Sequence, residues 1–125
     1  MKELFLKRAK ENLLAAELLL GKELFNASAN RAYYAAFHVA ITAIYSIGIE
    51  PKIEHKAVHS IFIDNYFNKK KILPSKLKSY LGDLRDKRNT ADYKTGINKK
   101  SAKSQLDYAK QLVTNIFEVI NDNKS

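Results

Sequence analysis

The strongest constraint on the fold comes from residues 32–41, AYYAAFHVAI, which are apolar on almost every side of a helix. A helix with this composition is packed by other elements on most of its sides. The chain shows no strand-type alternation bounded by turn clusters, so the elements around this helix are predicted to be helices as well. We therefore expect an all-α fold built around a buried central helix.

The breaks between helices are marked by the few residues that disfavour helix. Only four glycines and two prolines occur, and Gly21 and Gly48 stand where glycines that end helices are expected. The five helices predicted in this way span approximately residues 2–20, 27–47, 54–67, 75–92 and 101–121. We find no internal repeat and no linker. The prediction is a compact helical bundle in a single domain, residues 1–125.

Composition narrows the classes of function. The chain has no cysteine, which excludes disulfides, thiolate metal sites and cysteine nucleophiles. Charged residues interrupt the apolar pattern of the N-terminal segment, so we predict neither a secretory signal nor a membrane span. We expect a soluble, cytoplasmic protein that does not contact membranes.

The charge balance leaves two interpretations open. The 22 Lys and Arg against 13 Asp and Glu give a net charge of +9, which makes polyanions such as nucleic acids plausible partners. Many of the basic residues are lysines in loop-like positions, such as 69–71 and 99–100. Those lysines are equally consistent with a solvated surface.

The buried helix carries one polar line. Its members follow each other at intervals of 3, 4, 4 and 3, which keeps them on one helical face; they are Arg31, Tyr34, His38, Thr42 and Tyr45. A packed helix with such a line either meets another polar surface or lines a cleft. For His38, a structural role as a hydrogen-bonding side chain is favoured over a catalytic role.

A second unusual feature is an arginine on an apolar stripe. The stripe on the fourth helix is formed by Leu77, Tyr80, Leu81 and Leu84. The next position on it is Arg88, and a guanidinium is rarely buried without a partner. Arg85, Arg88 and Asp92 share a face, so Arg88 and Asp92 are candidates for an intrahelical ion pair. Alternatively, the arginine is held at an interface to grip phosphate with its forked donors.

Other familiar sites are absent or incomplete. His55 and His59 have the i, i+4 spacing of zinc ligands, but the residues between them do not include the glutamate of an HExxH motif. The sequence contains no GxSxG, GxGxxG or P-loop motif. We therefore predict no metal and no cofactor.

Three stretches together resemble the HEPN family, in particular a small single-domain prokaryotic branch. Residues 30–38, NRAYYAAFH, resemble the SRAYYAxFH signature of that branch. Residues 54–59, EHKAVH, resemble the start of its next helix, and residues 84–93, LRDKRNTADY, resemble its LrxxRxxADY ending. The resemblance covers about residues 4–120. It implies an up-and-down bundle of four to five helices that commonly dimerises.

The resemblance also implies an activity. HEPN ribonucleases place an R-x4-6-H motif from each subunit at the dimer interface, where they cleave RNA without a metal. An arginine can stabilise charge on the scissile phosphate while a histidine moves the 2′-hydroxyl proton. Such domains are often toxins encoded beside a minimal nucleotidyltransferase antitoxin, which in some pairs adenylylates a tyrosine at the motif.

This chain departs from that motif. After Arg88 it reads Asn-Thr-Ala-Asp-Tyr, and no histidine occurs after His59. The favoured hypothesis is therefore a homodimer whose Arg88 and Tyr93 face the two-fold axis. It binds RNA or nucleotide phosphate as a non-canonical component of a toxin–antitoxin or defence pair with a nucleotidyltransferase, and Tyr93 is a candidate target for modification. The residues expected to bind RNA or nucleotide are Arg31, Tyr34, His38, Arg85, Arg88 and Asn89.

Two alternatives remain. The first is a divergent metal-independent ribonuclease in which Arg88 holds the phosphate while Asp92, Tyr93 or His38 handles protons; the candidate catalytic residues are then Arg88, Asp92 and Tyr93. Tyrosine is a poor base near pH 7, and Asp92 would need a raised pKa for that role. The second is a helical adaptor without catalytic activity, in which Arg88 and Asp92 form only an interface ion pair.

Overall fold

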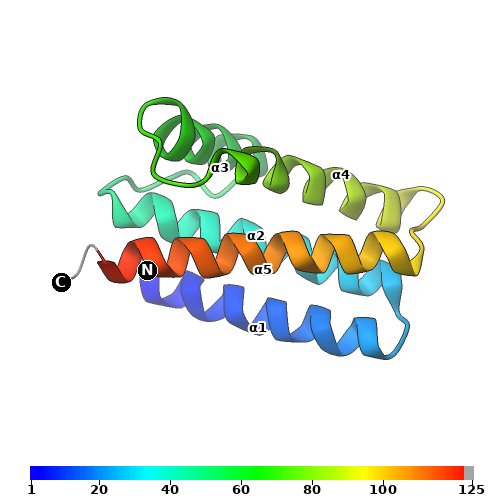
Figure 1. Cartoon of the computed structure of the whole chain (residues 1–125). Helices are drawn as coiled ribbons and strands as arrows, with labels where there is room; N and C mark the ends of the chain where they lie inside the picture. The colour runs from blue at the N-terminus through cyan, green and yellow to red at the C-terminus, as the bar shows by residue number, and fades with distance from the viewer. Residues whose placement is uncertain (123–125) are drawn as a thin grey trace.

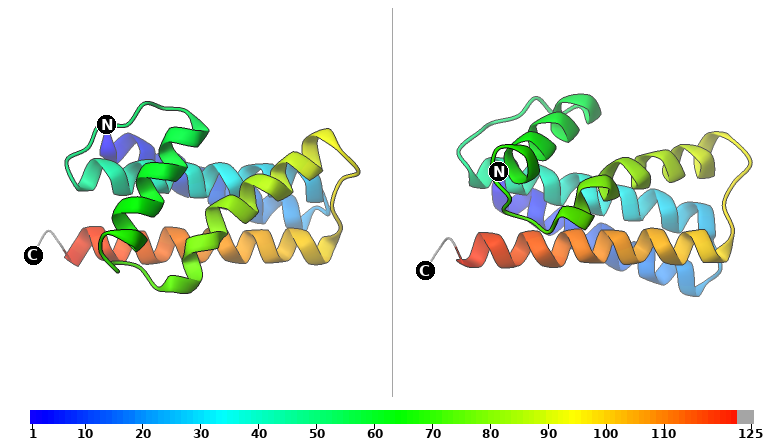
Figure 2. Two further views of the ribbon diagram at one scale, coloured as in Figure 1. Left: turned by 90° about the horizontal axis from the view of Figure 1, so that it is seen from above. Right: turned by 45° about the horizontal axis from the view of Figure 1, so that its top comes forward.

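The computed structural model describes residues 1–122, which contain helices and no strands. The α-helices are α1 (Lys2–Gly21), α2 (Phe25–Ser46), α3 (His55–Ile63), α4 (Tyr80–Tyr93) and α5 (Lys99–Asp122). Helices α1, α2, α4 and α5 alternate in direction along the bundle, whereas α3 lies across α2 (Figures 1 and 2). The predicted all-α, up-and-down bundle is confirmed.

Helix α2 is the centre of the bundle, as its apolar composition predicts. It packs against α1, α3, α4 and α5, and residues 39–44 are all buried. Two side-chain hydroxyl groups form hydrogen bonds between α2 and neighbouring elements. Ser28 of α2 donates to the Ala16 carbonyl of α1 (2.8 Å), and Tyr66 donates to the Ala43 carbonyl of α2 (2.6 Å). Burial raises the pKa of Tyr66 to about 12.

The ends of the first two helices differ from each other. Gly48 has a φ of +82° and its amide bonds to the Tyr45 carbonyl (3.0 Å), so it ends α2 in the left-handed conformation that glycine allows. Gly21 also lies at the end of its helix, as predicted, but it is not in the left-handed conformation. Gly21 is the last residue of α1, and the left-handed residue is Glu23, with a φ of +61°.

The predicted helices at 54–67 and 75–92 each contain a change of geometry. Helix α3 continues as a π-helix (η1, Asp64–Asn68), in which the adjacent residues Tyr66 and Phe67 are both buried. Helix α4 is preceded by a 3₁₀ turn (η2, Ser75–Ser79) that buries Leu77. Such local departures from the α-helix are common at helix ends and functional positions.

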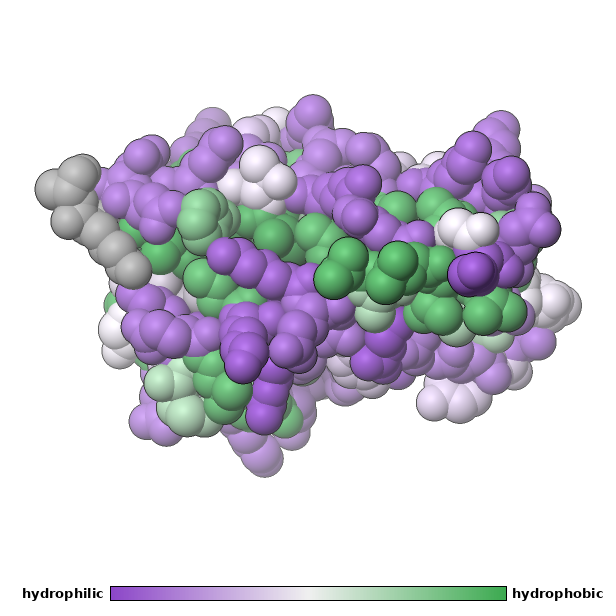
Figure 3. Space-filling model, turned by 90° about the horizontal axis from the view of Figure 1, so that it is seen from below, coloured by the Kyte–Doolittle hydropathy of each residue, from purple (hydrophilic) through white to green (hydrophobic). Residues whose placement is uncertain are grey.

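The outer surface of α1 carries apolar side chains that the bundle does not cover. Leu4, Leu14 and Leu18 are 38%, 57% and 63% exposed. Figure 3, which looks at the α1 side of the molecule, shows hydrophobic side chains gathered there among charged ones. Within residues 1–122, no helix is both long and apolar enough to cross a membrane.

Candidate functional site

Arg88 points from α4 onto two tyrosines of α2. Its guanidinium carbon lies 5.1 Å from the centre of the Tyr33 ring and 5.7 Å from that of Tyr34. Its Nη1 donates to the Tyr34 hydroxyl (3.1 Å), whereas its Nε is buried without a hydrogen-bond partner. The arginine therefore occupies the apolar stripe by stacking its cation against aromatic rings.

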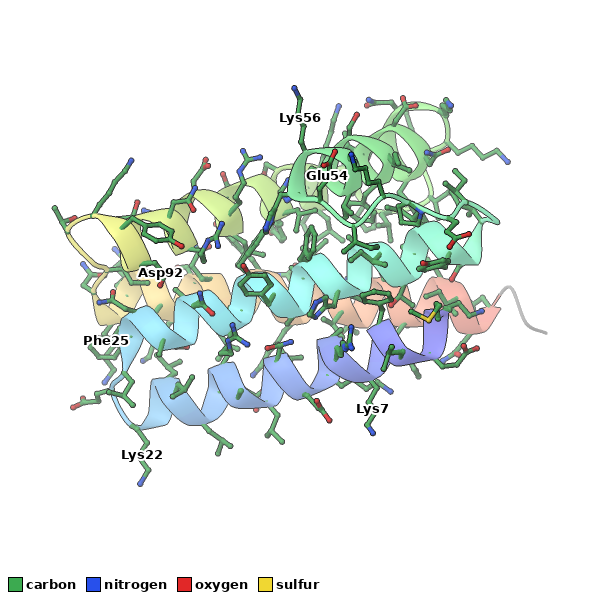
Figure 4. All side chains as sticks on the ribbon, turned by 180° about the vertical axis from the view of Figure 1, so that it is seen from behind. Lys7, Lys22, Phe25, Glu54, Lys56 and Asp92 are labelled. Carbon is green, nitrogen blue, oxygen red and sulfur yellow. The ribbon has the colours of Figure 1, made fainter. Side chains whose placement is uncertain are left out.

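In the described part of the chain, Arg88 and Asp92 do not form the ion pair that their spacing allows. Asp92 instead accepts a hydrogen bond from the Asn30 side-chain amide, Nδ2 to Oδ2, at 2.7 Å. Asp92 lies at the end of α4 where it approaches α2 (Figure 4). The carboxylate thus connects the two helices, and the Arg88 guanidinium keeps no carboxylate partner in the described part of the chain.

A chain of hydrogen bonds extends from this point along the polar line of α2. The Asn30 side-chain oxygen accepts from Arg31 Nε (2.9 Å) and Nη2 (2.5 Å). Arg31 Nη1 donates to the Asn12 side-chain oxygen of α1 (2.9 Å), and the Asn12 amide nitrogen lies 3.3 Å from His38 Nδ1. The polar line of α2 therefore meets another polar surface, one of the two outcomes that its spacing allowed.

Three residues of that line belong to the network and two do not. The Arg31 guanidinium lies 5.1 Å from the centre of the Tyr34 ring, and the rings of Tyr34 and His38 are 6.1 Å apart. Thr42 is buried and bonds to the His38 carbonyl of its own helix, whereas Tyr45 stacks on Phe5. Burial first, and then Arg8 and Arg31, lower the pKa of His38. The imidazole is therefore neutral at pH 7.

A second cluster, built around Tyr33, was not predicted. The hydroxyl of the fully buried Tyr33 lies 2.5 Å from His55 Nδ1 and 3.0 Å from His59 Nε2. A hydroxyl carries one hydrogen, so it can donate to only one imidazole. At least one histidine must therefore donate to the Tyr33 oxygen for both bonds to form. The one signal of this cluster in the sequence is the i, i+4 spacing of the two histidines.

Both histidines of the cluster are held in the neutral form. The pKa of His59 is lowered to about 4, first by burial and then by Arg85 and His55, against an opposing effect of Asp86. Burial, followed by Arg88 and Arg85, lowers the pKa of His55. Two neutral imidazoles can each accept a proton once their surroundings become more negative.

The remaining predicted residues lie at the edges of these networks. Tyr93 is 75% exposed, and its ring centre lies 6.0 Å from the Arg88 guanidinium. Arg85 approaches the exposed Asp86 through Nε (3.5 Å) and borders the histidine cluster. Asn89 is partly buried, and no hydrogen bond of residues 1–122 joins it to the networks.

The chemistry of the site follows from these groups. Within residues 1–122, no three His, Cys, Asp or Glu side chains are placed to hold a metal ion, and both imidazoles of the second cluster face a hydroxyl. Guanidinium groups bind phosphate, and a neutral imidazole can accept a proton. The arrangement can therefore bind an anion and move protons with side chains alone.

Comparison with known proteins agrees with the fold. The family model described as the HEPN domain matches residues 2–122. A search of curated proteins finds no match.

Proposed function

The chain belongs to the HEPN domain family, and we propose that it binds RNA or a nucleotide through phosphate at Arg88, as one component of a HEPN/minimal-nucleotidyltransferase pair of the toxin–antitoxin or defence type. Membership of the family supports a general RNA-related or toxin-like role. The observation that carries the proposal is the Arg88 guanidinium, whose Nε is buried without a hydrogen-bond partner and which has no carboxylate partner among residues 1–122.

A partly buried guanidinium with no carboxylate partner among residues 1–122 is unfavourable in the free protein. Removing a charged group from water costs free energy unless an opposite charge or hydrogen bonds compensate. The rings of Tyr33 and Tyr34 and the Tyr34 hydroxyl supply part of that compensation. A phosphate would supply the negative charge that the site lacks, and Arg31, whose guanidinium lies 5.1 Å from the centre of the Tyr34 ring, adds a second cation.

The proposal includes a homodimer with its two-fold axis near the end of α4. Tyr93 presents a large, mostly exposed ring next to Arg88, and a second copy would cover that ring. In the free chain its hydroxyl is also open to a partner enzyme, in line with Tyr93 as a target of a nucleotidyltransferase.

RNA binding by Arg88 variants tests the proposal. Arg88→Ala should weaken binding of a short single-stranded RNA by about tenfold or more, equivalent to about 1.4 kcal/mol, and should lower the slope of log Kd against log salt by about one charge. Arg88→Lys keeps the positive charge but lacks the paired N–H donors of the guanidinium, so it should recover part of the lost RNA affinity.

Lys87→Ala is the matched control, because it removes the same charge from an exposed neighbouring position. Equal binding by the parent and Arg88→Ala would refute the phosphate site. That result would favour the non-catalytic helical adaptor instead.

The second candidate function is metal-independent RNA cleavage. The observation in its favour is the pair of imidazoles on Tyr33, whose ring the Arg88 guanidinium covers. A histidine of this pair, or His38, Asp92 or Tyr93, would take the 2′-hydroxyl proton while Arg88 stabilises the phosphate.

Incubation of the pure protein with labelled RNA in EDTA tests cleavage directly. Cleavage that is lost in Arg88→Ala and in either His55→Gln or His59→Gln would support the enzyme and assign the imidazoles. Loss in Asp92→Ala with both histidine variants active would assign the proton transfer to the motif on α4. An intact RNA after prolonged incubation would exclude this candidate.

A further inference from the structure

An open hollow lies between α3, η1 and α4, on the outer side of the histidine cluster. Its volume is about 420 Å³, and the polar side chains that line it include Lys56, His59, Ser60, Asn68 and Arg85. His59 connects the hollow to the interior, because its Nε2 lies 3.0 Å from the Tyr33 hydroxyl. The hollow is therefore connected to the Arg88 site through His59 and the buried Tyr33.

The charges around the hollow favour an anion. Lys56 and Arg85 are both cations on its wall, and Lys56 projects outward from α3 (Figure 4). The acid on the wall, Asp64, is already paired with Lys69 at 3.2 Å. Arg85 contacts Asp86 only through Nε at 3.5 Å, a long and exposed pair that holds the guanidinium weakly.

We propose that this hollow is a second phosphate-binding site, in which Arg85 and Lys56 hold the oxygen atoms of a phosphate group beside His59. A guanidinium and an ammonium on facing elements are a common means of binding phosphate oxygens. Ser60 and Asn68 add neutral hydrogen-bonding groups on the same wall. This site does not depend on phosphate binding at Arg88.

Binding at the hollow is linked to a proton. The groups that face His59 are Tyr33 from α2, His55 from α3, and Arg85 and Asp86 from α4. Burial, Arg85 and His55 keep the pKa of His59 low in the empty hollow. An anion beside Arg85 cancels part of the positive potential, so it raises this pKa. Because the pKa of His59 in the empty hollow is about 4, the affinity for an anion increases mainly as the pH falls from about 5 toward 4.

Sulfate is a suitable probe, because it is a dianion that does not itself titrate in this range. The titration of His59 is followed by NMR of its ring signals on the full chain, in sulfate and in chloride at equal ionic strength. We expect sulfate to raise the His59 midpoint by at least half a pH unit. His38, whose cationic neighbours are Arg8 and Arg31, reports separately on anion binding near Arg31. A His59 midpoint that does not move in sulfate would overturn the proposal.

Three variants separate anion binding in this hollow from anion binding elsewhere on the chain. Arg85→Gln should raise the His59 midpoint without sulfate, since a cation is lost, and sulfate should then have no further effect. Lys87→Gln, with the same loss of charge on an exposed position, should respond to sulfate as the parent does. Arg88→Ala should also retain the sulfate response, so failure of the Arg88 site and failure of the hollow give different results.

The source of the phosphate is distinguished by competition. Inorganic phosphate and a short RNA without terminal phosphates are each added to the sulfate-loaded protein at pH 5.5. Displacement by the RNA supports a site for backbone phosphodiesters, and displacement by inorganic phosphate alone supports a site for free phosphate groups. If neither competes, the hollow is not a phosphate site.

Discussion

At the scale of single residues, Tyr33 joins the two halves of the candidate site. Its ring supports the Arg88 guanidinium and its hydroxyl contacts both His55 and His59. Burial is the main reason that its pKa is raised, and Arg88 and Arg85 oppose that effect only in part. The hydroxyl therefore stays protonated and acts as a hydrogen-bonding bridge.

Tyr33→Phe tests the value of that bridge. The ring contacts remain, while two partly buried imidazole nitrogens lose their shared partner, so the free energy of unfolding should fall by about 1–3 kcal/mol. Urea denaturation at pH 7 measures the change. Tyr93→Phe, which removes a hydroxyl from a mostly exposed ring, should change it by less than about 0.5 kcal/mol. Equal effects of the two variants would contradict the bridge.

The lowered pKa of His59 makes a prediction about acid stability. Its pKa is about 4 in the folded chain against the ordinary 6.5, so the unfolded chain binds the proton more readily. This contribution to stability is complete above pH 6.5 and is lost as the pH falls toward 4. The parent should therefore lose more unfolding free energy than His59→Gln between pH 7 and pH 4.5, as followed by urea denaturation. Parallel losses in the two proteins would argue against a depressed pKa.

At the scale of elements, the turn between α4 and α5 fixes where the end of α4 meets α2. Gly96 has a φ of +81°, and a Cβ built on it would lie 3.2 Å from the Asn26 side chain. Asn26 in turn accepts from the Ile97 amide (2.9 Å). This contact holds the turn on α2, the helix that the Asn30–Asp92 bond joins to the end of α4, so the turn helps to position the Arg88 face.

Three glycine variants separate the contributions at this turn. Gly96→Ala combines a strained φ with a close contact and should destabilise by more than about 1 kcal/mol. Gly48→Ala has a similar φ of +82° in open space, so it should cost less. Gly82→Ala lies inside α4 with nothing near its Cβ and should stabilise by about 0.5–1 kcal/mol. Thermal unfolding gives the order of stability of the three variants. A Gly96→Ala protein as stable as Gly82→Ala would contradict this account.

At the scale of the whole molecule, two exposed features compete as places for a second copy. One is the end of α4, where Tyr93 is exposed beside Arg88. The other is the apolar surface of α1 with Leu14 and Leu18 (Figure 3). The proposed two-fold axis lies at the first of these, because that arrangement brings the two Arg88 sites together.

Single introduced cysteines distinguish the two faces, since the chain has none of its own. Tyr93→Cys should give a disulfide-linked dimer under mild oxidation, because disulfides require Cα atoms within about 7 Å, a separation found near a two-fold axis. Leu18→Cys is the matched control on α1 and should remain monomeric on a non-reducing gel. Cross-linking at Leu18 alone would place the interface on α1 and contradict the proposed axis.

The fold was largely predictable from the sequence, whereas the networks were predictable only in part. Periodicity along one helix identifies which residues share a face, and so it identified Arg31, Tyr34 and His38, and also Arg88. It cannot identify the partner across the interface. The sequence suggested Asp92 as the partner of Arg88. In the structure, Asp92 accepts a hydrogen bond from Asn30, and Arg88 donates one to Tyr34.

The sequence by itself determined the helical class, the buried central helix and the odd arginine on the α4 stripe, because these depend on the order of apolar and polar residues along each helix. Only the tertiary structure decided that His55 and His59 share the Tyr33 hydroxyl and that Arg88 stacks on two tyrosines. Those contacts depend on the angle and distance at which α3 and α4 pack on α2. Packing between helices is set by side chains far apart in the chain, and no local pattern contains it.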